Sequence, residues 1–133
     1  MESCTHLGIS PELCGAPVEL SPGEATAALT PTPEMAADDR GLVHGGFVFG
    51  LADYAAMLAV NDPNVVLGAA ECRFLAPVRV GEELTARARE EPSESAPSGG
   101  RKRQVEVTVQ RGEDEVFQGR FTCFVLDHHV LDG

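Results

Sequence analysis

The sequence predicts an α+β protein in which a curved antiparallel sheet of five to six strands wraps around one long helix. Residues 45–61 are almost continuously apolar, and Asp53 is the only formally charged side chain among them. A helix that is apolar on every side needs cover on every side. Four strand-like segments follow the helix and two shorter ones precede it, and the sequences between them favour antiparallel order.

The segment before the helix is typical of an opening hairpin. Residues 1–15 are expected to form an irregular or short helical lead-in. Residues 16–20 form a short predicted strand and residues 24–32 a second one, with a Ser-Pro-Gly turn between them. Two prolines and an acidic stretch then prevent regular structure up to Val43.

The long helix is predicted to begin at a Gly-Gly pair and to end before Asn61, where Asx and proline residues stop it. A loop rich in proline, serine and glycine at 92–100 separates two of the later strands. We expect residues 1–133 to form one domain, with a C-terminal tail at 128–133. The strands predicted after the helix are 65–77, 82–90, 103–111 and 115–127.

The composition argues against several classes of protein. The 133 residues carry a formal charge of −11, which disfavours a broadly cationic binder of nucleic acid or of membrane surfaces. The apolar segment is also shorter than a membrane span. The chain begins without a basic and apolar leader, and its four cysteines form no CxxC pair. We therefore expect a cytoplasmic protein with reduced thiols.

The cysteines are expected to be structural. Cys72 and Cys123 lie in strand-like segments and are predicted to be small buried hydrophobes. No metal is predicted, because the spacing of Cys4, His6 and Cys14 matches no zinc pattern.

Asp53 is the first candidate for a functional residue. Burial of an unpaired carboxylate is costly, so pairing, hydrogen bonding or protonation must compensate it. At about 100° per residue, Gly46, Gly50, Asp53 and Met57 share one stripe of the helix, and the glycines leave open volume beside the acid. The alternative is structural, with the glycines admitting a neighbouring element and Asp53 capping a backbone group.

The helix start is the second candidate. In His44-Gly45-Gly46 the glycines allow close approach to the backbone, and first-turn N–H groups can donate to a carbonyl oxygen or an anion. A tight turn is the structural alternative. Gly46 and Asp53 are about 10 Å apart along the axis, too far to act on one carbonyl. Two antiparallel copies would bring each helix start to the other's Asp53, so we expect a homodimer with two sites at the interface.

The residues that carry these features resemble those of a known family. The run VHGGFVFGLADYA at 43–55, Asn61 and the sequence FLAP at 74–77 resemble hotdog-fold acyl-CoA thioesterases of the PaaI-like branch, which act in phenylacetic acid degradation. The resemblance covers about residues 17–127. It implies a hotdog fold and an N–H of Gly45 or Gly46 that polarises the thioester carbonyl. It also implies that Asp53 of another subunit activates water or attacks directly.

Further residues are assigned around this centre. The substrate pocket is expected to involve His44, Phe47, Gly50, Tyr54, Met57 and Glu71. Within that set, His44 is expected to fix the turn by hydrogen bonding rather than to act as the base. Glu71 is either a second acid near the site or a partner for Arg73, and we favour the ion pair. Asp38 stands where many members have an asparagine.

Coenzyme A would need cations or amides for its phosphates. Arg101, Lys102 and Arg103 form the densest basic cluster of this acidic chain and are the candidates for that role. A flank that keeps an edge strand soluble is the alternative.

The sequence thus predicts a cytoplasmic hydrolase of a small acyl- or aryl-CoA that uses no cofactor and no metal. It is expected to be a homodimer that could pair further into a tetramer, without nucleic-acid or membrane partners. Two alternatives stay open. One is an acyl-CoA or acyl-carrier-protein binder without turnover, and the other is a hotdog dehydratase or hydratase.

Overall fold

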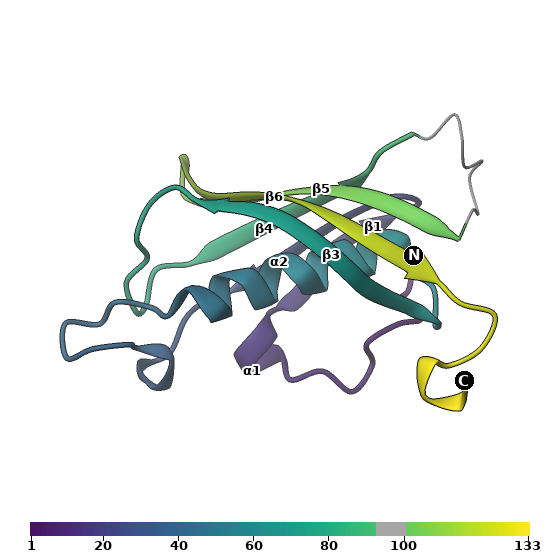
Figure 1. The fold of residues 1–133 in the computed structure, drawn as a ribbon. Helices are drawn as coiled ribbons and strands as arrows, with labels where there is room; N and C mark the ends of the chain where they lie inside the picture. Colours follow the sequence, from purple (N-terminus) through teal and green to yellow (C-terminus); the bar gives the residue numbers. More distant parts are fainter. Residues whose placement is uncertain (93–100) are drawn as a thin grey trace.

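The computed structural model describes residues 1–92 and 101–133, and the predicted loop at 92–100 lies almost wholly outside them. One long helix, α2 (Gly45–Val60), lies against one face of a six-stranded antiparallel sheet (Figure 1). The sheet order is β1-β2-β4-β5-β6-β3, so β1 and β3 are its edges. This confirms the predicted α+β hotdog architecture.

The elements follow the predicted order with small differences in their ends. The second strand stops at Leu29 rather than at residue 32, since Pro31 follows closely. The strand after the helix stops at Phe74, and the amides of Leu75 and Ala76 both turn to the Val116 carbonyl. The strands are β1 (Ala16–Ser21), β2 (Glu24–Leu29), β3 (Val65–Phe74), β4 (Leu84–Glu90), β5 (Lys102–Arg111) and β6 (Asp114–Val125), and the short helices are α1 (Pro11–Cys14), η1 (Pro33–Met35) and η2 (Val130–Asp132).

The helix α2 is covered on two sides within one protomer. One side packs on the central strands β2, β4 and β5, and α1 lies on the side away from the sheet (Figure 1). The lead-in is fastened to the helix end, where Asn61 accepts the Cys4 N–H at 2.8 Å and donates to the Glu2 carbonyl at 3.0 Å. No helix in the described part of the chain is long and apolar enough to span a membrane.

Buried and exposed residues alternate along the strands, as expected for a sheet with one face packed against the helix. Val105, Val107 and Val109 of β5 are buried against the helix, while the residues between them face outward. Cys123 is buried as predicted. Cys72 is exposed, and its predicted burial was wrong. The reason is the position of β3 at the sheet edge, where every residue from 68 to 74 is exposed.

Gly68 marks an irregularity in this edge strand. The register between β3 and β6 shifts between Leu67 and Ala69. A Cβ atom at Gly68 would overlap the ring of Phe124, so a larger residue here would require that ring to move.

Candidate functional site

The first turn of α2 holds a specific arrangement of amides. His44 is the N-cap, and its Nδ1 accepts the Gly46 N–H at 2.8 Å. The Phe47 N–H donates to the His44 carbonyl at 3.0 Å. His44 therefore fixes the turn, as predicted. Among the N–H groups of Gly45, Gly46 and Phe47, only that of Gly45 has no partner within the described residues.

The chain that leads into the helix is held by two neighbouring segments. The Val43 N–H donates to the Val78 carbonyl at 2.8 Å, and the His44 N–H donates to the Met35 carbonyl at 3.0 Å. An open hollow of about 360 Å³ lies beside the helix start. Its wall includes Phe74, which is 54% exposed and whose ring would lie 3.2 Å from a Cβ placed on Gly45. The lining residues are Val43, Gly45, Val48, Phe74, Leu75, Ala76, Pro77 and Val78.

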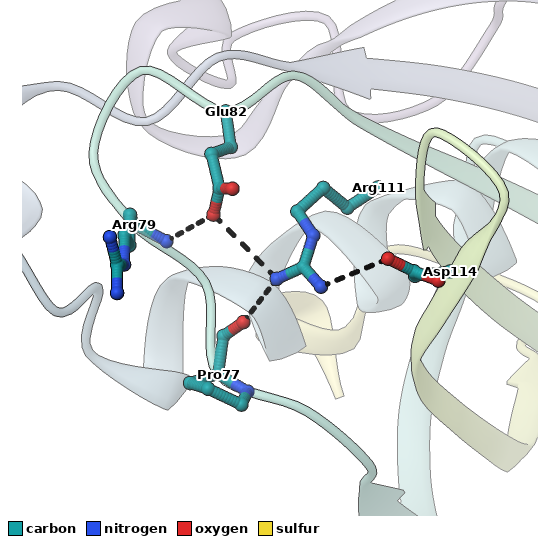
Figure 2. Close-up of polar contacts among 5 residues, drawn as sticks. All are labelled: Pro77, Arg79, Glu82, Arg111 and Asp114. Carbon is teal, nitrogen blue, oxygen red and sulfur yellow. Dashed lines mark hydrogen bonds and ion pairs between the residues drawn. The ribbon is translucent and has the colours of Figure 1, made fainter.

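Arg111 ties the wall of this hollow to the β5–β6 hairpin (Figure 2). Its Nη1 donates to the Pro77 carbonyl and lies 3.6 Å from Glu82, and its Nη2 lies 3.3 Å from Asp114. The same Glu82 oxygen accepts the Arg79 N–H at 2.6 Å. Sequence reasoning missed Arg111. The only local signal was an arginine at a strand end three residues before an aspartate.

Asp53 lies two turns further along the same helix. Its Oδ1 is buried and has no hydrogen-bond partner in the described part of the chain. Burial raises the pKa of this carboxyl from 3.8 to about 6. No backbone group is capped by this oxygen there, which disfavours the structural alternative. Asp53 is therefore a half-buried acid whose buried oxygen has unused hydrogen-bonding capacity.

Two thiols lie on either side of this acid. Burial is the main cause that raises the pKa of Cys14, at the end of α1, and it raises the pKa of Cys123, on β6, to about 12. The charge of Asp53 adds to both shifts. A third direction is open, since a Cβ placed on Gly50 would meet nothing within 4 Å. The half of α2 that carries Gly46, Gly50 and Asp53 thus has an uncovered side in one protomer.

Other predicted pocket residues are placed differently. Tyr54 and Met57 are buried, and the Tyr54 ring lies 6.3 Å from that of His6 in the lead-in. Phe47 is partly buried beside the His44 ring. Of these three, Phe47 is the one in the first turn of the helix, and none of them lines the hollow beside the helix start.

Glu71 lies on the outer face of the sheet. It is opposite Arg120, the neighbour of the buried Phe121, so the sheet separates it from Asp53. No ion pair joins Glu71 to Arg73 within the described ranges, and the favoured pairing of these two residues was wrong. The reason is that the nearest neighbour of a strand residue is the residue opposite it on the next strand, here Arg120 for Glu71, rather than a residue two positions away on the same strand.

The basic cluster lies at the far end of the sheet from the helix start. Lys102 is opposite Phe124, whereas Phe74, which touches Gly45, is opposite Phe117. Arg103 forms a half-buried ion pair with Glu90 at 2.7 Å, with side chains 16% and 20% exposed. Arg101 and Lys102 are exposed. One protomer therefore does not bring these cations to the amides of the helix start.

Residues 40–92, which include the helix start and Asp53, match the family model for the thioesterase superfamily. Over this stretch of 53 of its 133 residues, the chain is similar to that superfamily. A crystal structure of an uncharacterised Pyrococcus horikoshii protein is 51% identical, with a TM-score of 0.94 over 99% of this chain and 98% of that one. A mutant of the phenylacetic acid degradation protein PaaI from Thermus thermophilus is 29% identical, with a TM-score of 0.73 over 86% of this chain and 95% of that one.

Curated relatives of this chain carry other names. A methylthioribose-1-phosphate isomerase of Aquifex aeolicus is 50% identical over 128 residues, which are 96% of this chain and 27% of that protein. The transcription factor FapR of Caldanaerobacter subterraneus is 28% identical over 121 residues, 90% of this chain and 58% of that protein. The chain thus spans about a quarter of the isomerase and somewhat over half of the transcription factor.

Proposed function

We propose that this chain hydrolyses the thioester bond of a small acyl- or aryl-CoA. The observation that carries the proposal is the half-buried carboxyl of Asp53, whose pKa is raised to about 6 and whose buried Oδ1 has no partner among the described residues. It lies on a helix whose first amide, that of Gly45, is also without a partner among them. Groups with shifted pKa values inside a protein are candidates for acid–base chemistry. The match of residues 40–92 to the thioesterase superfamily supports the same reaction class.

The oxyanion would be held by the N–H of Gly45. The Gly46 N–H is bonded to His44 and joins only if that ring rotates or its Nδ1 becomes protonated. Amides aimed at the developing charge are commonly the largest single contribution to such a reaction. Phe74 and Pro77, which line the adjacent hollow, would border the acyl group there.

Asp53 would act as the general base. It takes a proton from water while the water oxygen attacks the thioester carbon, and the C–S bond of the tetrahedral intermediate then breaks. The leaving thiolate needs little acid assistance, since thiols ionise near pH 8.5. Direct attack by Asp53, which gives an anhydride that water then hydrolyses, is the variant of this mechanism. The reaction as written uses water and no cofactor.

A second copy of the chain would complete the site. Gly45 and Asp53 are eight residues apart on one helix, about 12 Å along its axis, and cannot reach one carbonyl together. Antiparallel helices from two copies would place each acid at the other's helix start. The same arrangement brings the partner's basic sheet end nearer to this helix start, where the partner's Arg101 and Lys102 would meet the coenzyme A phosphates.

Thiol release from short, aromatic and long acyl-CoAs tests this proposal. Asp53→Asn preserves the shape of the side chain and removes the base, so hydrolysis should fall by about 100-fold or more. Asp53→Ala should fall similarly. Full hydrolysis in both variants would remove Asp53 from the mechanism.

A non-catalytic acyl-CoA or acyl-carrier-protein binder is the second candidate. The similarity to a transcription factor over 121 residues favours it. Calorimetric titration with a non-hydrolysable acyl-CoA analogue, run beside the thiol-release assay, separates the two. Tight binding with no release from any substrate would favour the binder. A dehydratase or hydratase is disfavoured, because the Nδ1 of His44 is committed to the Gly46 amide.

A further inference from the structure

Two exposed arginines near the helix start, Arg40 and Arg79, form no ion pair within residues 1–92 and 101–133. Their backbone N–H groups, in contrast, are both held by acids. The Asp38 Oδ1 accepts the Arg40 N–H at 2.9 Å, and the Glu82 Oε1 accepts the Arg79 N–H at 2.6 Å. Figure 2 shows the Arg79 guanidinium pointing away from Glu82 and Arg111. These two carboxylates are therefore engaged by the backbone, and the guanidinium groups stay available to a ligand.

One short ribbon brings the two arginines together. Leu42 and Arg79 lie opposite each other in an antiparallel bridge. The Val80 N–H donates to the Gly41 carbonyl at 2.9 Å, which brings Arg40, the residue before Gly41, to the same end of the ribbon. The arginines therefore occupy neighbouring positions on a hydrogen-bonded ribbon rather than on a free loop.

This ribbon adjoins the hollow at the helix start. Its buried residues Val43 and Val78 line that hollow together with Gly45, whose N–H has no partner in the described part of the chain. Leu42, opposite Arg79, is three residues before Gly45, about 10 Å along an extended chain. The pantetheine arm of coenzyme A contains three units of roughly peptide length, so it spans about 10 Å or more. A thioester at the Gly45 amide would therefore carry the far end of this arm to the arginines.

We propose that Arg79 and Arg40 bind the diphosphate at the end of the pantetheine arm of an acyl-CoA. The proposal rests on the proposed function, and it assigns an anionic part of the substrate to the protomer that carries the amide. A guanidinium donates two parallel N–H bonds to a phosphate, which suits arginine to this role. The separate phosphate on the ribose of coenzyme A would remain for the partner's Arg101 and Lys102.

The acidic surroundings make close contact necessary. Asp39, next to Arg40, and Glu83, next to Glu82, are exposed and form no ion pair within the described ranges. The chain as a whole carries a charge of −11, so it offers an anion little long-range attraction. Bidentate hydrogen bonds must then supply the affinity. Arg79→Lys, which keeps the charge without the fork of donors, should recover only part of what Arg79→Gln loses.

Two carriers of one acyl group test the assignment. Acyl-CoA has the diphosphate, and the matching acyl-pantetheine has no phosphate. Arg79→Gln keeps the N–H that Glu82 accepts and removes the guanidinium. The preference for acyl-CoA, measured as the ratio of the two kcat/KM values, should therefore shrink about tenfold, mainly through KM. Arg40→Gln should shrink the ratio in the same direction.

Arg89→Gln is the matched control. Arg89 is an exposed arginine on the outer face of β4, and its substitution should keep the wild-type ratio. An unchanged ratio in Arg79→Gln and Arg40→Gln would overturn the assignment. An equal fall of kcat/KM on both carriers would overturn it as well, since that result indicates a disturbed helix start rather than a lost phosphate contact.

Calorimetric titration with the free carriers keeps the test independent of hydrolysis. Dephospho-CoA, which retains the diphosphate, should bind the wild-type chain more tightly than pantetheine, and Arg79→Gln should reduce that difference about tenfold. Phosphopantetheine, the form that carrier proteins hold, should bind less tightly than dephospho-CoA. Equal binding of these two would contradict a diphosphate site and favour the single phosphate of a carrier protein.

The two proposals can fail separately. Dephospho-CoA binding that depends on Arg79, without thiol release from any acyl-CoA, would keep the phosphate site and remove the hydrolase. Thiol release that needs Asp53, with a preference for acyl-CoA that neither arginine affects, would keep the hydrolase and remove the phosphate site.

Discussion

Asp53 shows how much a single residue type can reveal in a sequence. A lone carboxylate in a uniformly apolar helix must be compensated, and that reasoning identified it before any coordinates. The structure adds what the sequence could not give. Its Oδ1 has no partner among the described residues, and burial raises its pKa to about 6. The helix start gives a similar result. The histidine before Gly-Gly predicted the turn, but the sequence did not show that the Gly46 N–H donates to His44.

The pH dependence of hydrolysis should follow this carboxyl. The base must be ionised, and with a pKa of about 6 it is mostly so at pH 8. As the pH falls through 6 the carboxyl is protonated, and kcat/KM at pH 5 should be about tenfold below its plateau. A pH profile of thiol release with a single acidic limb near 6 checks this. A flat profile from pH 5 to 8 would exclude Asp53 as the base.

The free energy of unfolding should fall as the pH rises through 6, whereas hydrolysis should increase over the same range. Because the folded-state pKa of Asp53 lies above the ordinary 3.8, the folded protein holds this proton more tightly than the unfolded chain. The penalty for the buried charge is therefore fully present above about pH 6 and vanishes below about pH 4. Asp53→Asn should raise the free energy of unfolding by about 1 to 3 kcal/mol at pH 8. Urea unfolding at pH 8 and pH 4 should show the gain shrinking at the lower pH.

Secondary-structure elements were the most predictable level. The hairpin, the helix and the four later strands all follow from apolar periodicity and turn residues. Strand ends were less predictable, because β3 ends where the amides of Leu75 and Ala76 turn to Val116. The Arg111 cluster could not be foreseen at all, since it joins a loop to a hairpin about thirty residues away (Figure 2).

Arg111 should position the helix start through the loop that it holds. Its bond to the Pro77 carbonyl steadies the segment whose Val78 carbonyl accepts the Val43 N–H. Arg111→Gln should speed hydrogen exchange at the Val43 amide and lower kcat/KM about tenfold, mainly through KM. Arg111→Lys should recover part of both.

Arg87→Gln is the matched control for this loop. Arg87 is an exposed arginine of β4 that bonds Gln110 on the outer face at 2.7 Å. The Arg87→Gln variant should leave the hydrogen-exchange rate of the Val43 amide and the KM unchanged. Equal effects of Arg87→Gln and Arg111→Gln would indicate general destabilisation rather than positioning.

The architecture of the whole molecule was predictable from the sequence, but which residues are exposed, and on which face of the sheet, was less so. A helix that is apolar on all sides must be covered by other elements, and the strand-like segments of the sequence predicted the sheet that covers it. Which strand lies at the edge decides the exposure of Cys72, the face of Glu71 and the distance of Lys102 from the helix start. Strand order comes from non-local pairing, so local patterns did not reveal it.

Mixing two inactive variants tests most directly whether Asp53 of one copy acts at the helix start of another. Gly45→Pro removes the free N–H at a position where helices accept proline, and Gly45→Ala is its control with the N–H retained. Gly45→Pro and Asp53→Asn should each be inactive. Refolded together in equal amounts, they should recover about a quarter of wild-type thiol release, because half of the dimers contain one intact site. No recovery on mixing, with dimers formed, would place the acid and the amide in one protomer and contradict the shared site.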